Sequence, residues 1–235
     1  NAPESVGLFV QAGDTRGESQ GYNTLGLIEA DAGRFGEALE YHIKALAIRQ
    51  RTGDREGLAY SFNNLGNIYR NLGRHAQALE HHEKGLALKI ELGMKSSEAY
   101  SHHNIGLVYY EMGELEKALA AYRRGFAIRE ELDDARAIGV SLNAIALVQS
   151  RTNPRGALDT YERALALRRE TGDRRGEMAT QLNLADVHFR MGSLDLANAA
   201  ANRALEIGEH IHAPLMQSNG LKVLAEVEAA RGGYP

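Results

Sequence analysis

Hydrophobic residues recur along this chain at helical spacing. Between residues 64 and 72 the large apolar residues lie at offsets of 3, 4 and 7 from Leu65, which places them on one face of a helix. The same spacing resumes after Gly73 and continues to Ile90. Glycine enters the left-handed conformation that ends helices at little cost. The pattern therefore predicts two antiparallel helices joined by a turn at Gly73.

This helix pair repeats along the chain. One small residue, preceded each time by leucine or isoleucine, marks the first helix of each unit: Gly26, Gly66, Gly106, Ala146, Ala185 and Ala225. The spacings between these residues are 40, 40, 40, 39 and 40. A fixed period of this size is typical of a solenoid, in which each unit buries its apolar face by stacking on the next. We therefore predict an all-α fold.

Two kinds of punctuation separate the predicted helices. The turns within units carry Gly33, Gly73, Gly113, Asn153, Gly192 and Gly232, and we expect glycine and asparagine to end a helix there in the left-handed conformation. Between units the chain carries Gly13-Asp14, Gly53-Asp54 and Gly172-Asp173, with Gly93-Met94 and Asp133-Asp134 as departures. Aspartate accepts the free backbone amides at a helix start, so we expect these aspartates to be N-caps.

The repeated residues resemble the tetratricopeptide repeat. Its large, Leu-Gly, aromatic, turn and small positions are matched in the second unit by Phe62, Leu65, Gly66, Tyr69, Gly73, Ala78 and Gly85, and in the third by His102, Ile105, Gly106, Tyr109, Gly113, Ala118, Tyr122 and Gly125. The longer, Gly-Asp-punctuated units are similar to Pins-type adaptors and to the repeat arms of bacterial signalling proteins. The resemblance implies a right-handed superhelical solenoid of antiparallel helix-turn-helix repeats.

The repeat register divides the chain into one array over residues 1–235. We predict a half-repeat at 1–13, full repeats at 14–53, 54–93, 94–133, 134–172 and 173–212, and a terminal half-repeat or capping helix at 213–235. Because both ends fall inside a repeat and no methionine begins the chain, we expect a piece of a longer protein.

Composition narrows the function classes. The formal net charge is −4 and the isoelectric point is about 6.2, which argues against nucleic acid as a partner because such binding needs a basic surface. No apolar run approaches the roughly 20 residues of a membrane-spanning helix, so we expect no membrane contact. The absence of cysteine removes disulfides and thiolate metal sites but is compatible with either redox environment. Cytoplasm is our expected location.

Nine histidines invite a search for metal or acid–base chemistry. Register assigns five of them to positions held elsewhere by packing aromatics, so we predict packing roles for His42, His75, His82, His102 and His188. The segment Glu209-His210-Ile211-His212 lacks a third histidine at ligand spacing. No phosphate-binding loop, GxSxG, HExxH or cysteine nucleophile is present. We therefore expect no catalytic residue, no metal, no cofactor and no enzyme.

The resemblance implies that the first helix of each unit lines a concave groove, and candidate partner-binding residues gather there. An asparagine amide bonds both the C=O and the N–H of an extended peptide, tyrosine adds apolar area with a polar tip, and arginine pairs with carboxylates or phosphates. The alternative is that the asparagines bond neighbouring helices or water. The candidate set is Asn23, Tyr60, Asn63, Asn64, Asn67, Arg70, Tyr100, His103, Asn104, Tyr110, Asn143, Arg151, Asn183 and Arg190.

These patterns predict a protein-interaction module. We expect it to bind an extended peptide or helix of a partner protein in the groove, as the scaffold or sensor part of a larger signalling or regulatory protein. Two alternatives remain open: a self-association scaffold that forms homo-oligomers through its end helices, and a regulatory arm of an enzyme or DNA-binding domain outside this chain.

Overall fold

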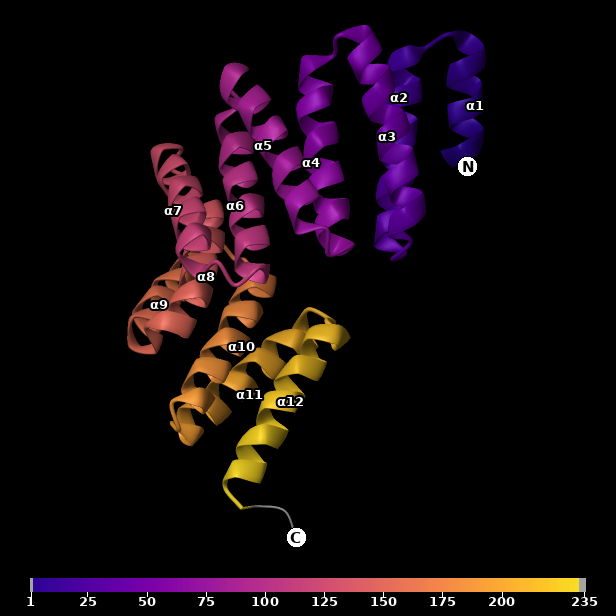
Figure 1. Cartoon of the computed structure of the whole chain (residues 1–235). Helices are drawn as coiled ribbons and strands as arrows, with labels where there is room; N and C mark the ends of the chain where they lie inside the picture. Colours follow the sequence, from indigo (N-terminus) through magenta and orange to yellow (C-terminus); the bar gives the residue numbers. More distant parts are fainter. Residues whose placement is uncertain (1, 233–235) are drawn as a thin grey trace. The chain divides into compact units, whose positions relative to one another are not determined.

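The computed structural model describes the backbone of residues 2–232, together with their side chains apart from those of residues 2–5, 215 and 216. Residue 1 and the last three residues of the predicted terminal half-repeat lie outside the described residues. Within 2–232 the chain forms twelve α-helices and no strand (Figure 1). The all-α fold of helix-turn-helix repeats is confirmed. The helices are α1 (Ala2–Ala12), α2 (Thr15–Asp31), α3 (Phe35–Thr52), α4 (Arg55–Asn71), α5 (His75–Glu91), α6 (Lys95–Glu111), α7 (Leu115–Glu131), α8 (Ala135–Thr152), α9 (Pro154–Glu170), α10 (Arg174–Arg190), α11 (Leu194–His210) and α12 (Pro214–Ala230).

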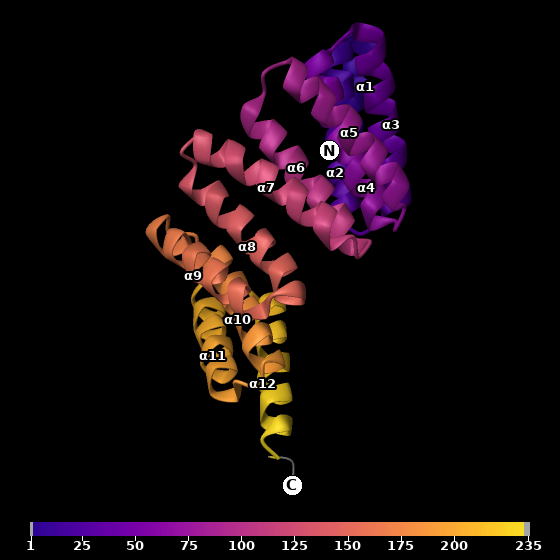
Figure 2. The ribbon, with the colours of Figure 1, turned by 60° about the vertical axis from the view of Figure 1, so that its left-hand side comes forward.

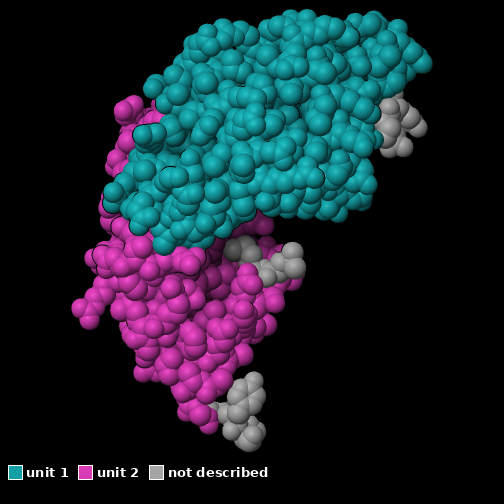
Figure 3. All heavy atoms as spheres, in the orientation of Figure 1, with its two compact units in different colours: residues 1–125 teal, residues 126–235 magenta. Residues whose placement is uncertain are grey.

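The chain forms two compact units, Asn1–Gly125 and Phe126–Pro235, coloured separately in Figure 3. In the first unit α2 packs on α3 and α4 packs on α5, and successive pairs meet through α3 with α4 and α5 with α6. In the second unit α8 packs on α9 and α10 on α11. Figure 2 shows α10, α11 and α12 side by side, as their mutual contacts require. Each unit therefore buries its apolar faces pair against pair.

The helix ends follow from the punctuation, with one exception. The carboxylate of Asp54 accepts a hydrogen bond from the Gly57 N–H at 2.9 Å, and Gly53 ends α3 at φ 69°. Asp14, Asp134 and Asp173 cap α2, α8 and α10 in the same way. The expectation for Asn153 was wrong, because its φ is −144° and its side chain caps α9 through the Gly156 N–H. The turn there is shorter, which accounts for the single 39-residue spacing.

A ring from the second helix of a pair fills the space over the small residue of the first. A Cβ added to Gly26 would meet the His42 ring at 2.7 Å, and one added to Gly66 would meet the His82 ring at 2.6 Å. His42 and His82 are each 1% exposed. Their packing role, predicted from register, is confirmed.

Buried cations join consecutive repeats, which the sequence analysis missed. Arg49 donates to the Ser61 hydroxyl at 2.7 Å and to the Gly57 carbonyl at 3.0 Å. Forty residues later, Lys89 donates to the Ser101 hydroxyl at 2.7 Å. Burial lowers the pKa of Lys89 to about 8. The repeat register contained this signal, since a cation recurs at positions 49, 89, 129 and 168.

Candidate functional site: the groove face

All of the candidate binding residues lie on the first helices of the repeats. We call the surface that they form in each unit the groove face of that unit. On α2 it carries Asn23; on α4 Tyr60, Asn63, Asn64, Asn67 and Arg70; on α6 Tyr100, His103, Asn104 and Tyr110; on α8 Asn143 and Arg151; and on α10 Asn183 and Arg190.

Asparagines on the groove face of the first unit bond one another between repeats. Nδ2 of Asn64 donates to Oδ1 of Asn23 at 2.7 Å. One repeat further on, Nδ2 of Asn104 donates to Oδ1 of Asn63 at 3.0 Å. The two bonds have the same direction and the same sequence separation of 41 residues. They join first helices that follow one another in the solenoid.

The second unit contains a related arrangement. Nδ2 of Asn183 donates to Oδ1 of Asn143 at 3.2 Å, and the Thr180 hydroxyl donates to the same oxygen at 3.0 Å. The open alternative of the sequence analysis, amides bonded to neighbouring helices, is thus realised for six of the asparagines. These bonds fix the orientation of each amide.

The pairing leaves hydrogen-bonding capacity unused. An amide side chain has two donor hydrogens and two acceptor lone pairs, and each pair uses one donor from one asparagine and one lone pair from the other. Asn23 and Asn64 are half-buried, whereas Asn63 and Asn104 are buried. The side chain of the half-buried Asn67 forms no hydrogen bond with another described residue. The groove face therefore presents unsaturated amide groups at Asn23, Asn64 and Asn67, of which the first two are held in place by their mutual hydrogen bond.

Two tyrosines stand beside these amides in the first unit. Tyr60 is 43% exposed and Tyr100, forty residues later, is 48% exposed. His103 is half-buried, with its ring centroid 5.2 Å from that of Tyr122. Exposed tyrosines offer a large contact area at small conformational cost. Tyr60 and Tyr100 are the exposed aromatic side chains of this face, whereas Tyr110 is half-buried.

Two arginines of the groove face, Arg70 and Arg190, already have acidic neighbours. Nε of Arg70 lies 3.6 Å from a carboxylate oxygen of Glu111 in the next repeat. Nε of Arg190 lies 2.9 Å from a carboxylate oxygen of Asp186, and Nη1 donates to the Ser150 carbonyl at 3.3 Å. A ligand anion would have to compete with these contacts.

A groove of about 430 Å³ lies on the groove face between α10 and α12. Leu182 and Val223 are its large apolar residues, in the register positions that Asn63 and Asn104 hold in the first unit. Its polar lining comprises Asn183, Asp186, Asn219, Lys222 and Glu226. The residues of α12 were not among the candidates, although each lies 40 residues after an α10 residue that lines the same groove.

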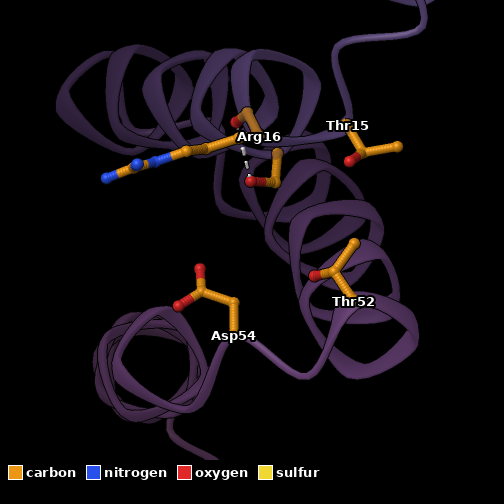
Figure 4. Close-up of a pocket in the computed structure, with 5 residues that line it drawn as sticks. Thr15, Arg16, Thr52 and Asp54 are labelled. Atoms are coloured by element: carbon orange, nitrogen blue, oxygen red, sulfur yellow. Dashed lines mark hydrogen bonds between the residues drawn. The ribbon is translucent and has the colours of Figure 1, made fainter.

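A second cavity, of about 350 Å³, lies at the helix ends of the first two repeats (Figure 4). Thr15, Arg16, Thr52 and Asp54 line it together with Ser19. The Ser19 hydroxyl donates to the Arg16 carbonyl at 3.0 Å, and Asp54 caps α4. Because these groups serve helix ends, we assign this cavity no binding role.

The family model of the tetratricopeptide repeat matches residues 18–91, 97–170 and 152–210. The chain belongs to the tetratricopeptide repeat family. Comparison with curated proteins gave no match.

Nothing in the family or in the described side-chain clusters points to enzymatic activity. No group of three or more potential metal-ligating side chains comes together among the described residues, and no helix in that part of the chain is long and apolar enough to cross a membrane.

Solved structures share the fold at low sequence identity. BtubC from P. vanneervenii is 23% identical over 90% of each chain, with a TM-score of 0.76. Aspartyl phosphate phosphatase F from Bacillus subtilis is 15% identical over 92% of this chain, with a TM-score of 0.81. A Rap protein complexed with competence and sporulation factor is 14% identical over 91% of this chain, with a TM-score of 0.78. The chain spans 58% and 64% of the latter two proteins.

Proposed function

We propose that this tetratricopeptide repeat chain is a protein-interaction module that binds an extended peptide or a helix of a partner protein on its groove face. The observation that carries the proposal is the set of amide pairs, which recur in both units. Each pair holds its amides in fixed orientations and leaves donors and acceptors unused. Preorganised groups of this kind lose little freedom when a ligand binds.

The first unit suits recognition of a peptide backbone. Asn64 and Asn67 lie three residues apart on α4, and their unused amide groups complement the C=O and N–H of an extended chain. Tyr60 and Tyr100 supply apolar contact that demands no particular sequence. Because peptide backbones differ little, we expect affinity from the amides and selectivity from the surrounding side chains.

The second unit suits an amphipathic segment. The groove between α10 and α12 has Leu182 and Val223 as its large apolar residues, and Asp186, Lys222 and Glu226 among the charged residues that line it. Burying apolar side chains of a partner there would release water from both surfaces. The charges of both signs would help to select the partner.

The comparisons favour protein over small-molecule partners. One neighbour of this fold was solved in complex with a competence and sporulation factor, and another is named a quorum sensor. By analogy, we propose that the chain is the scaffold or sensor part of a larger signalling protein, in the cytoplasm. This step rests on shared fold and on the exposed groove face.

A display selection followed by calorimetry tests the proposal. Peptides selected on the immobilised chain are titrated into the wild type and into the double variant Tyr60→Ala, Tyr100→Ala. Matched controls are Ile43→Ala and Ile90→Ala, which truncate residues of the second helices that are 46% and 53% exposed. We expect the tyrosine variant to bind at least about tenfold more weakly and the controls to bind as the wild type does. Equal affinity in the tyrosine variant, with loss in the isoleucine variants, would refute the groove face as the site.

Self-association is a second candidate that one observation favours. Leu8 on α1 is 65% exposed and Leu221 on α12 is 58% exposed, and large exposed apolar residues are typical of contact surfaces. Light scattering over a range of concentrations decides between the candidates. A mass that rises with concentration and returns to the monomer in Leu8→Glu, Leu221→Glu supports the scaffold; a constant monomer mass dismisses it.

A further inference from the structure

One position on the second helices changes character from repeat to repeat. Tyr41, His81 and Ala121 occupy it at spacings of 40 residues. In the first of these repeats the Tyr41 ring stacks on Tyr22, with centroids 6.2 Å apart and ring planes 23° apart. The position is thus built to receive an aromatic ring.

The next repeat places a ring in the same location. His81 lies 4.9 Å from Tyr69 and 6.1 Å from Phe62, measured between ring centroids. Phe62 is the register equivalent of Tyr22. The imidazole of His81 is therefore in contact range of two aromatic rings of its own repeat, at distances typical of aromatic pairs.

In the third repeat the ring is missing because the residue is Ala121. A cavity of about 270 Å³ occurs here, within the first unit. Its lining includes His102 and Tyr109, which are the equivalents of Phe62 and Tyr69, and the apolar Leu86 and Ile105. A ring therefore recurs at both neighbouring positions in the second and third repeats, although Glu29 replaces one of them in the first, and the third repeat has no ring at the position itself.

A cation accompanies the position in each of these repeats. In the first, the Lys44 ammonium lies 5.6 Å from the Tyr22 centroid and 5.5 Å from the Tyr41 centroid. Arg124 holds the same register position beside the cavity, whose lining also contains Glu83 and Lys117. The Lys117 ammonium already lies 5.4 Å from the Tyr109 centroid. A guanidinium attracts the electron-rich face of an aromatic ring. The cavity therefore offers a ring a guanidinium neighbour in addition to apolar and aromatic walls.

In the second unit two other residues occupy this position, and each has neighbours of its own. Thr160 occupies it and donates to the side-chain oxygen of Gln149 at 2.7 Å. Ala200 occupies it in the following repeat and packs against the apolar cluster around Tyr161. Neither arrangement leaves an alanine facing two rings and a cation, so the third repeat stands apart.

We propose that the cavity between α5, α6 and α7 binds the aromatic ring of a tyrosine or phenylalanine side chain of a partner protein. The guest ring takes the place that Tyr41 and His81 fill in the preceding repeats, against His102 and Tyr109 and beside Arg124. A side chain is the expected source because the internal occupants are side chains carried on a polypeptide. None of the residues that line this site belongs to the candidate set of the groove face, and the proposal does not depend on the function proposed for that face.

Methyl NMR of the full chain with labelled alanine tests the proposal. The probes are N-acetyl-tyrosinamide, N-acetyl-phenylalaninamide, N-acetyl-leucinamide and p-cresol. We expect both aromatic amides to shift the Ala120 and Ala121 methyl signals saturably, with Kd on the order of 1–10 mM for so small a contact. N-acetyl-leucinamide should produce no saturable shift, because its side chain has no ring face for Arg124.

A variant that restores the ring provides the sharpest control. Ala121→Tyr copies Tyr41 and should abolish the saturable Ala120 shift while leaving the melting temperature unchanged or higher. Ala87→Tyr, at an exposed position on α5 outside the cavity, should leave binding intact. If Ala121→Tyr does not fold, Ala121→His, which copies His81, decides the same question. No saturable shift in the wild type, equal binding of N-acetyl-leucinamide, binding of p-cresol alone, or retained binding in the folded ring variant would each overturn the proposal.

Discussion

In the first unit the pairs α2/α3 and α4/α5 are filled by imidazoles over glycine, whereas the pair α8/α9 of the second unit is filled by the phenol ring of Tyr161. His42, His82 and Tyr161 hold one register position and are almost completely buried. Tyr122 holds the same position in the pair α6/α7, and the buried Ala201 holds it in α10/α11. The comparison teaches that the first four pairs accept either an imidazole or a phenol ring at this position. The two kinds of ring differ in how they respond to low pH, because an imidazole can be protonated there and a phenol cannot.

The largest expected effect is acid destabilisation of the first unit. Burial, assisted by nearby cations, lowers the pKa of His42 to about 4 and that of His82 to about 3, from 6.5 in the unfolded chain. The unfolded chain therefore binds more protons, and stability falls as the pH falls below 6.5. Between pH 7 and pH 4.5 we expect a loss of about 2–3 kcal/mol per histidine. Urea unfolding at the two pH values measures it.

The matched control gives these histidines the residue of the second unit. His42→Tyr, His82→Tyr should reduce the acid loss by the contribution of both imidazoles. Carboxylates remain as a common background in both proteins. An identical pH dependence of wild type and double variant would show that the buried imidazoles do not control acid stability.

Enlarging the glycine beneath a ring should have the next largest effect. In Gly66→Ala the new Cβ would lie 2.6 Å from the His82 ring, while in Gly36→Ala on α3 it meets nothing within 4 Å. We expect Gly66→Ala to destabilise the chain by about 1–3 kcal/mol and Gly36→Ala to stabilise it by up to about 1 kcal/mol. Urea unfolding midpoints compare the two. A neutral Gly66→Ala would contradict the close helix approach.

The amide pairs of the first unit can be exchanged for the apolar pair of the second. Asn104→Ala leaves the buried Asn63 without its partner, which should cost about 1–2 kcal/mol. Asn63→Leu, Asn104→Val copies Leu182 and Val223 and should restore most of that stability. Thermal unfolding compares the three proteins. A double variant less stable than Asn104→Ala would mean that the hydrogen bond between the Asn63 and Asn104 side chains itself holds the repeats in register.

The smallest expected effect comes from a missing cap. Met94 holds the register position at which Asp54 and Asp173 cap their helices. The carboxylates of these two aspartates also lie 3.9 Å from Nε of the buried Arg49 and 3.7 Å from Nη1 of the buried Arg168. Met94→Asp should stabilise the chain by about 1 kcal/mol and raise the pKa of Lys89. Met94→Asn supplies the cap without the charge, so it should raise the melting temperature less. A melting temperature of Met94→Asp equal to or below that of the wild type would contradict the assignment of position 94 as an uncapped helix start beside Lys89.

The sequence was sufficient for the fold because period and glycine placement are local signals. Helix pairs, N-caps and the buried roles of His42 and His82 followed from register alone. The turn at Asn153 did not, because asparagine serves both as a left-handed helix end and as an N-cap, and only the length of the turn decides between them. Composition cannot distinguish these two uses.

The candidate site was predictable in position but not in bonding. The register placed the asparagines on first helices, yet which amide faces which depends on the stacking of one repeat on the next. That stacking pairs Asn64 with Asn23 rather than with Asn63. The groove between α10 and α12 was missed because its apolar lining breaks the asparagine pattern that guided the search.

Side-chain amide NMR tests the central claim, that the groove face binds a partner peptide, most directly. A peptide obtained by display selection is titrated into the labelled chain, and the asparagine side-chain signals are followed. We predict saturable shifts at Asn23, Asn64 and Asn67, with no change on the second helices α3 and α5. Shifts confined to α3 and α5, with these three amide signals unmoved at saturation, would contradict the account.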